Sequence, residues 1–293
     1  MKLCLLPPRT IASGGVLRHI DAIRKHTKHT VIDDITQADI VHVHAGWPSM
    51  RRDIYTCHGL NIITRDTPYY FIRENQIVEQ HLRNSPINIT VSNFFASALN
   101  QKGLRIDYVI PNGTDINHSI KPAYEPFVLW LGKLDPIKRP EELIHIANKV
   151  PNLKFVATLP QVCEKQAKHG NVACVGEYVP HPLAQDLLRR CSVYLLTSEF
   201  ETFSISILEA WAMHKPAVAR RMSGAPAELI RHDIDGMLYD NIDDAVDKIN
   251  RCLIKPKLYG EAGFEHVQDF QWKSIVPIID EVYLQCNISQ KSQ

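Results

Sequence analysis

The sequence predicts an α/β protein with two doubly wound, Rossmann-like domains. Short apolar runs alternate with helical patterns along almost the whole chain, and the alternation pauses once, near residues 111–126, before it starts again. Strands that are apolar throughout and separated by helices form parallel sheets that are covered on both faces. The 293 residues are long enough for two such domains.

The first part of the chain carries the pattern of one such domain, at residues 1–117. Its expected helices have apolar residues at helical spacing and cover Gly15–Lys25, Phe71–Arg83 and Asn93–Gln101. Its expected strands are short apolar runs, and they cover Lys2–Leu6, Thr30–Asp33, Ile40–His44, Asp53–Cys57, Asn88–Val91 and Tyr108–Ile110.

A turn and a linker separate this part from a second domain at residues 118–270. Pro111–Gly113 has turn chemistry, and Lys121–Pro126 is typical of an extended linker. The expected strands are Phe127–Leu131, Lys154–Ala157, Val172–Val175, Val193–Thr197 and Ala217–Arg220. The expected helices are Pro140–Lys149, Pro182–Arg190, Ser204–Met213, Ala225–His232, Ile242–Leu253 and Tyr259–Asp269. A last helix, Trp272–Leu284, precedes a polar tail, Asn287–Gln293, that we expect to be frayed.

The charge balance excludes several classes of protein. Thirty-three Lys and Arg against 32 Asp and Glu give a net charge of +1, which excludes a disordered, highly charged chain and argues against bulk capture of nucleic acid. The first domain carries a net charge of +3 and the remainder −2. This small asymmetry fits an evenly solvated surface better than it fits an acidic partner.

Neither a membrane span nor a disulfide framework is expected. No run approaches the roughly 18 apolar residues that cross a bilayer, and the apolar run Met1–Leu6 is too short for a signal-peptide core. The seven cysteines are scattered and form no Cys-x-x-Cys pair, so that disulfides and a zinc–thiolate site are not predicted. We therefore expect a cytoplasmic protein.

The most informative segment is Val193–Ala219. An apolar strand leads into a loop with Glu201, and the helix expected from Ser204 carries Glu209 on its second turn. The N-terminus of a helix attracts phosphate, and carboxylates at these places could accept hydrogen bonds from the hydroxyls of a sugar and a ribose. On this segment alone, a helix-capping Glu201 and a solvated Glu209 are equally good interpretations.

Glu201 and Glu209, in their sequence context, resemble the E-x7-E motif of the retaining GT-B glycosyltransferases of family four, the group 1 type. The resemblance implies two Rossmann-like domains facing a central cleft, and a helix at 271–287 that crosses back to the first domain and leaves 288–293 as a tail. It also implies a nucleotide diphosphate-sugar donor bound by the second domain. Glu209 would hold the ribose and Glu201 the sugar, beside Thr202, Phe203 and Ser204.

Leu131–Lys138 resembles the G-R-L-x-x-x-K stretch of that family, whose two cations hold the diphosphate. Here the residues are Gly132, Lys133 and Lys138. Lysine keeps the charge of the usual arginine but lacks its bidentate fork. Two cations beside the diphosphate would stabilise the charge that develops as the glycosidic bond breaks, and this gives both lysines a catalytic role.

Three segments of the first domain also resemble the family. Gly14 and Gly15 resemble its glycine loop, and His58 follows the strand whose terminal histidine lies beside the donor sugar, which makes it a catalytic candidate. His42 and His44 point to the same side of their strand and could bind a metal. Because no third ligand is apparent in the sequence, we expect no metal and no required cofactor.

The chain departs from the family where Thr202 and Ser204 replace two glycines. The loop becomes stiffer, and Ser204 is expected to act as the N-cap of the following helix. These replacements put the identity of the donor in doubt more than the fold. The chain is also short for the family, which suggests a first domain with few additions.

The acceptor is expected to bind the first domain along Leu60–Asn75. An aromatic and basic wall is predicted there, made of Trp47, Arg65, Tyr69, Tyr70 and Arg73. Such a wall would suit a sugar, a lipid phosphate or, less favoured, a modified DNA base. An ordinary packed loop is an equally good interpretation. The basic helix at Gly15–Lys28 leaves peripheral contact with the inner membrane face open, although its apolar face is short.

The predicted function is sugar transfer with retention of configuration, by attack on the face from which the phosphate leaves. Two alternatives belong to other classes. A nucleotide-sugar epimerase shares the architecture but needs no acceptor. A non-catalytic nucleotide-sugar binding protein would show binding without turnover. The base, the sugar, the acceptor and the linkage cannot be named from the sequence.

Overall fold

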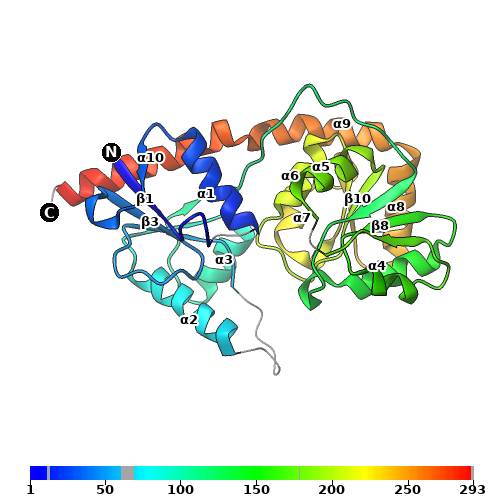
Figure 1. The fold of residues 1–293 in the computed structure, drawn as a ribbon, viewed down its shortest axis with the longest axis horizontal. Coiled ribbons are helices and arrows are strands. Elements are labelled where there is room, and N and C mark those ends of the chain that lie inside the picture. The colour runs from blue at the N-terminus through cyan, green and yellow to red at the C-terminus, as the bar shows by residue number, and fades with distance from the viewer. Residues whose placement is uncertain (12–13, 61–68, 178, 292–293) are drawn as a thin grey trace. The chain divides into compact units, whose positions relative to one another are not determined.

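The computed structural model describes residues 1–11, 14–60, 69–177 and 179–291. The chain forms two compact units, one made of Met1–Gly113 with Gln271–Gln293 and the other of Thr114–Phe270. Each unit is an α/β layer structure around one parallel sheet (Figure 1). The predicted fold class is therefore confirmed. The first boundary lies at 113/114, where the amide of Thr114 already donates to the carbonyl of Phe270, instead of at 117/118.

The sheet of unit 1 has the strand order β2-β1-β3-β4-β5-β6. All neighbours are parallel, and the strands are β1 (Lys2–Leu6), β2 (Thr30–Ile32), β3 (Ile40–His44), β4 (Ile54–Cys57), β5 (Ile87–Thr90) and β6 (Tyr108–Val109). The helices are α1 (Gly14–His26), α2 (Tyr69–Asn84), α3 (Asn93–Gln101) and α10 (Trp272–Lys291). Helices α1 and α10 lie together on one face of this sheet (Figure 1).

Helix α10 completes unit 1, although it is the last element of the chain. Its residues Trp272, Ile279 and Tyr283 lie in the same buried cluster as Leu3 and Ile20. The predicted tail at 288–293 was wrong for its described part, because the helix continues to Lys291. Its last turn is held on unit 1 by Gln290 Nε2, which donates to Asp53 Oδ1 at 2.8 Å.

The sheet of unit 2 has the order β12-β11-β10-β7-β8-β9, again all parallel. The strands are β7 (Phe127–Trp130), β8 (Lys154–Ala157), β9 (Val172–Cys174), β10 (Val193–Leu196), β11 (Ala217–Arg220) and β12 (Gly236–Tyr239). The helices are α4 (Pro140–Lys149), α5 (His181–Arg190), α6 (Ile205–Ala212), α7 (Ala225–Leu229), α8 (Ile242–Ile254) and α9 (Pro256–His266).

Each sheet has one place where the chain reverses its direction of winding. In unit 1 it lies between β1 and β3, and in unit 2 between β7 and β10. At such a switch point the loops that leave the carboxyl ends of the two strands turn apart, which opens a crevice for a ligand. The loops after β7 and β10 carry the predicted donor residues, and the loop after β3 follows His44.

None of the helices in the described part of the chain combines the length and the apolar character that crossing a bilayer requires. All seven cysteines are buried free thiols.

Two glycines let helix α9 approach helix α6 and the turn that follows it. A Cβ at Gly260 would collide with the carbonyl oxygen of His214, and a Cβ at Gly263 would collide with the indole ring of Trp211. The side chain of Trp211 is fully buried, and its Nε1 donates to the carbonyl of Asp235 at 2.9 Å. This contact therefore depends on the absence of two side chains.

We predict that Gly260→Ala lowers the free energy of unfolding. Alanine gains up to about 1 kcal/mol of helix propensity, but overpacking a buried contact costs about 1–3 kcal/mol, and a clash with backbone cannot relax by a rotamer change. The control is Glu265→Ala, an exposed position on the same helix, which should stay within about 0.5 kcal/mol. The urea midpoints of the three proteins measure the effect, and a midpoint for Gly260→Ala at or above the native one would contradict it.

Lys215 is a fully buried cation in the loop before β11. Its Nζ donates to the carbonyl of Ala123 and lies 3.8 Å from the centroid of the Tyr124 ring. Burial lowers its pKa to about 8. The contact holds the segment before β7 against the rest of unit 2. Its cost is the partial desolvation of the ammonium group.

We predict that Lys215 makes stability rise with pH. The unfolded chain keeps this proton up to the ordinary pKa of 10.5, whereas the folded chain releases it near 8. Between these values the unfolded state binds more protons, so that the free energy of unfolding rises, by about 2–3 kcal/mol in total. The difference between the native chain and Lys215→Met, measured by urea unfolding from pH 7.5 to 10.5, isolates this group. An equal pH dependence of both proteins would contradict the prediction.

Candidate functional site

The two loops at the switch point of unit 2 are joined by Thr197, the residue after β10. Trp130 Nε1, at the end of β7, donates to Thr197 Oγ1 at 2.8 Å, and that hydroxyl donates to the carbonyl of Lys138 at 2.6 Å. The amide of Glu199 donates to the carbonyl of Ile137 at 2.7 Å. These bonds fix the relative position of the loops, and therefore of the side chains that they carry.

Lys138 and Glu201, predicted from separate motifs, meet at this place. Lys138 Nζ donates to Glu201 Oε1 at 2.6 Å, and Ser198 Oγ donates to the same oxygen at 2.7 Å. The backbone amide of Glu201 donates to the carbonyl of Ser223 at 2.7 Å. Glu201 therefore does not cap α6. Its carboxylate keeps acceptor capacity, and the ammonium keeps two protons, for a ligand at this edge.

Lys133 and Gly132 lie in the loop after β7. Lys133 is exposed and makes no ion pair with the residues that the structure describes. A Cβ at Gly132 would collide with the indole ring of Trp130, and its amide donates to Thr158 Oγ1 at 2.8 Å. The packing of Trp130 alone explains why a glycine is needed at this position, whether or not a phosphate also approaches it.

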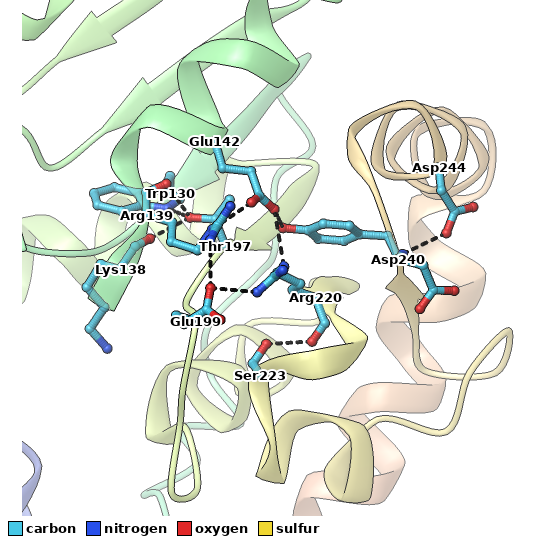
Figure 2. A network of polar contacts seen from close by, with 11 residues as sticks. Trp130, Lys138, Arg139, Glu142, Thr197, Glu199, Arg220, Ser223, Asp240 and Asp244 are labelled. Carbon is cyan, nitrogen blue, oxygen red and sulfur yellow. Dashed lines mark hydrogen bonds and ion pairs between the residues drawn. The ribbon is translucent and has the colours of Figure 1, made fainter. Parts of the chain in front are cut away.

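Two arginines and two glutamates form a compensated network beside this pair (Figure 2). Glu199 Oε2 accepts from Arg139 Nη1 at 2.6 Å and from Arg220 Nη1 at 2.8 Å. Glu142 Oε2 accepts from Arg139 Nε at 2.7 Å, and Glu142 Oε1 accepts from the hydroxyl of Tyr239 at 2.7 Å. Burial, and then the charge of Glu142, raises the pKa of Tyr239, which stays a neutral donor.

This network was not predicted from the sequence, because its members come from four different elements. Its charges sum to zero, so that Arg139 and Arg220 are structural partners of glutamates rather than uncompensated cations for a phosphate. Figure 2 shows the side chain of Lys138 extending away from the network. The cations available to a diphosphate in this region are therefore Lys133 and, shared with Glu201, Lys138.

Helix α6 begins after Ser204, where the prediction of a side-chain cap was wrong. Ser204 occupies the N-cap position with φ of 86°, makes no capping hydrogen bond, and has its Oγ 3.1 Å from Ser206 Oγ. This is the left-handed region, which glycine adopts freely and other residues adopt at a cost of about 1–2 kcal/mol. The side chain of the N-cap residue therefore does not occupy the first amides of the helix, and amides at a helix start can bind anions.

The other donor candidates follow on and before this helix. Glu209 is 8% exposed on α6, so that it is not the solvated helix residue that the sequence also allowed. Thr202 is half-buried, and Phe203 is buried with its ring 6.2 Å from that of Phe270. A largely buried carboxylate one helical turn beyond a helix start could accept hydrogen bonds from vicinal hydroxyls.

Unit 1 has a pocket of about 230 Å³ below the carboxyl ends of β3 and β4. Its polar side chains are His58, Glu74 and Asn75, and its other described lining residues are Val16, Ala45, Gly46, Gly59, Leu60 and Val78. Glu74 lies against the backbone at Gly46, where a Cβ would come within 2.5 Å of its Cγ. Glu74 and Asn75 were not predicted, because the acceptor wall was inferred from aromatic and basic residues only.

The predicted acceptor wall has a mixed outcome. Trp47 is half-buried and its carbonyl accepts from His81 Nε2 at 2.8 Å, while Arg73 is exposed on α2. Neither belongs to the described lining of the pocket. Tyr69 and Tyr70 begin α2, but their side chains, like Arg65, lie outside the described residues.

Four histidines gather near the switch point of unit 1. His42 and His44 come from β3, His58 follows β4, and His19 lies on α1, which starts at Gly14 with φ of 56° and Gly15. The rings of His42 and His44 are 4.0 Å apart, and those of His19 and His58 are 4.8 Å apart. The fold thus brings His19 and His58 beside His42 and His44. The sequence did not show that these residues would meet.

Burial lowers the pKa of each of these histidines below its ordinary value of 6.5. The pKa of His19 falls to about 4, and those of His42, His44 and His58 fall well below 6.5. The neighbouring imidazoles reinforce the effect for the last three. All four rings are thus neutral at pH 7, and His58 can offer a hydrogen bond but not a positive charge.

Comparison with known proteins gives three kinds of match. Residues 125–255 match the family model "Glycosyl transferases group 1". Curated relatives named D-inositol 3-phosphate glycosyltransferase are 22% identical over 81% of this chain and 65% of the relative in Mycolicibacterium smegmatis, and 26% identical over 79% and 63% in Mycobacterium sp. strain KMS. The chain spans a little less than two thirds of the length of these relatives.

Solved structures share the fold. HepE from Anabaena, solved in complex with UDP and glucose, has a TM-score of 0.72 at 18% identity and covers 97% of this chain and 100% of its own. Sucrose-phosphate synthase from Thermosynechococcus elongatus has a TM-score of 0.72 at 19% identity and covers 90% and 76%. The residues that match the group 1 glycosyltransferase family all lie inside unit 2, and both units share the GT-B fold of the solved structures.

Proposed function

We propose that the chain transfers a sugar from a nucleotide diphosphate-sugar to an acceptor hydroxyl, with retention of configuration. The observation that carries the proposal is the Lys138–Glu201 ion pair at the switch point of unit 2, followed by the uncapped start of α6 and the buried Glu209. These are the groups that a diphosphate, a sugar and a ribose require, in one region of one domain.

Each part of the donor has a candidate partner. Lys133, Lys138 and the start of α6 would hold the diphosphate, since each places positive charge or free amides at this edge. Glu209 would accept hydrogen bonds from the ribose hydroxyls, and Glu201 would accept from the sugar. UDP is the first nucleotide to test, because structures of HepE and of TarM from S. aureus were solved with it.

Retention would follow from attack on the face that the diphosphate leaves. The bond from the anomeric carbon to the phosphate oxygen breaks, the acceptor oxygen forms the new bond, and the acceptor proton passes to the departing phosphate oxygen. The lysines stabilise the charge that develops on the diphosphate. Neutral His58 would contact a sugar hydroxyl. With this cation set, the mechanism needs no metal ion and no cofactor.

The acceptor pocket of unit 1 favours a compound rich in hydroxyl groups. The carboxylate of Glu74 can accept hydrogen bonds from hydroxyls, and the amide of Asn75 can both accept and donate them. The charge of Glu74 would repel a phosphate placed beside it. The volume of about 230 Å³ is below the roughly 300–1,000 Å³ of pockets for drug-sized ligands, and it suits one sugar-sized group. Acceptors on lipid or DNA are less favoured proposals. The proposed location is the cytoplasm, and contact with the inner membrane face is the less favoured alternative.

Thermal shift measurements with UDP-, GDP- and ADP-sugars test the donor site. A ligand at about 100 times its dissociation constant adds roughly 2.7 kcal/mol, which raises the melting temperature by several degrees. We expect a rise with one nucleotide class, reduced by at least half in Glu209→Ala and kept in the exposed control Glu265→Ala. No rise with any class, or an equal rise in Glu209→Ala, would contradict the donor assignment.

Substitution of Glu201 tests the sugar-binding role. Glu201→Gln keeps the shape but removes the ion pair with Lys138, and we expect kcat to fall about 100-fold, while the KM for the donor changes much less. Glu141→Gln, exposed on the first turn of α4, is the matched control. NMR of the product should show the anomeric configuration of the donor. An inverted product would refute retention, turnover without an acceptor would indicate an epimerase, and binding without turnover a non-catalytic protein.

A further inference from the structure

We propose that His19, His44 and His58 form a binding site for one late first-row divalent metal ion, with Zn²⁺ as the best match. The inference concerns unit 1 alone and does not rest on the proposed sugar transfer. It also replaces the expectation, based on the missing third ligand, that the His42/His44 pair binds no metal.

The three imidazoles are close enough to share an ion. One ring nitrogen from each can be chosen so that all three lie within 4.8 Å of one another, and this is the only such group in the part of the chain that the structure describes. His44 Nδ1 and His58 Nε2 are 3.1 Å apart. Ligand nitrogens of tetrahedral zinc, with bonds of about 2.0–2.1 Å, lie about 3.3–3.4 Å apart, so that small side-chain rotations complete the site.

His19 is set up as a ligand by its other ring nitrogen. His19 Nδ1 is 2.8 Å from Asn112 Oδ1, an amide oxygen that can only accept, so that Nδ1 carries the hydrogen and Nε2 carries the lone pair. His19 is 1% exposed, and its Nε2 has no hydrogen-bond partner among the residues that the structure describes. Metal-bound histidines typically donate their second N–H to an oxygen in this way, which fixes the tautomer and the ring.

His44 and His42 differ in the same respect. His44 is fully buried, its Nδ1 faces His58, and its Nε2 has no partner in the described part of the chain. In contrast, His42 Nδ1 lies 2.7 Å from the hydroxyl of Tyr283 and His42 Nε2 lies 2.7 Å from Thr56 Oγ1. His42 therefore has no nitrogen left for an ion, although its ring packs on that of His44. The unpartnered Nε2 of buried His19 is costly, and a metal ion bound there would satisfy it.

The chemistry of the site selects the kind of ion. Neutral imidazoles are good ligands for Zn²⁺, Co²⁺, Ni²⁺ and Cu²⁺, whereas Mg²⁺ and Ca²⁺ prefer oxygen. His58 also lines the pocket of unit 1, which provides an entry path and a place for a fourth ligand such as water.

The test uses the full chain purified without a polyhistidine tag and stripped of metal. We expect one equivalent of Zn²⁺ to bind in equilibrium dialysis, Co²⁺ to give the visible absorption of a tetrahedral nitrogen site, and Zn²⁺ but not Mg²⁺ to raise the melting temperature. His19→Gln and His44→Gln should each weaken Zn²⁺ binding at least about 10-fold. Asn112→Leu should weaken it about 10–100-fold through loss of the bond that orients His19.

The matched control is His81→Gln, a buried histidine outside the cluster, which should bind Zn²⁺ as the native chain does. Circular dichroism of each metal-free variant shows whether it folds. If the two buried variants do not fold, His58→Gln, at the least buried ligand, decides the question. Absence of binding to the native chain, or equal affinity in His58→Gln and the native chain, would overturn the proposal.

Discussion

The arrangement of the candidate donor site depends on the hydrogen bonds of one hydroxyl, that of Thr197. It accepts from the indole of Trp130 and donates to the backbone at Lys138, so that the loops after β7 and β10 share one point of attachment. Parallel strands at a switch point direct their loops apart. Together with the bond from the Glu199 amide to the Ile137 carbonyl, this hydroxyl opposes that divergence, and the Lys138–Glu201 pair relies on the loops staying together.

The two sheets are built alike, but the side chains at their switch points differ in charge. At the switch point of unit 2 the side chains are charged and paired, and the arginine–glutamate network leaves little uncompensated charge. At the switch point of unit 1 they are neutral imidazoles kept uncharged by burial. A charged leaving group and a neutral, hydroxyl-bearing partner would therefore each meet a surface of suitable chemistry, and the difference arises from side chains rather than from backbone architecture.

Sequence patterns predicted the parts of the molecule that depend on local order. Strand and helix periodicity located nearly all elements, and motif spacing located Lys138 and Glu201, because each belongs to one continuous segment. Contacts between distant segments could not be predicted in this way: Arg139, Glu199 and Arg220 come from three places in the chain, and His19 joins His44 only through the packing of α1. Serine rarely adopts the left-handed backbone conformation, so that the conformation of Ser204 could not be predicted from its sequence context.

The position of α10 has a consequence for how the protein is made. Unit 2 is one continuous segment and can fold as soon as it has left the ribosome, whereas unit 1 also needs α10, which is synthesised after unit 2. The usual order, in which the N-terminal domain folds first during synthesis, is thereby reversed. Throughout translation of unit 2, the apolar face of unit 1 that will hold Trp272 and Tyr283 therefore lacks its covering helix.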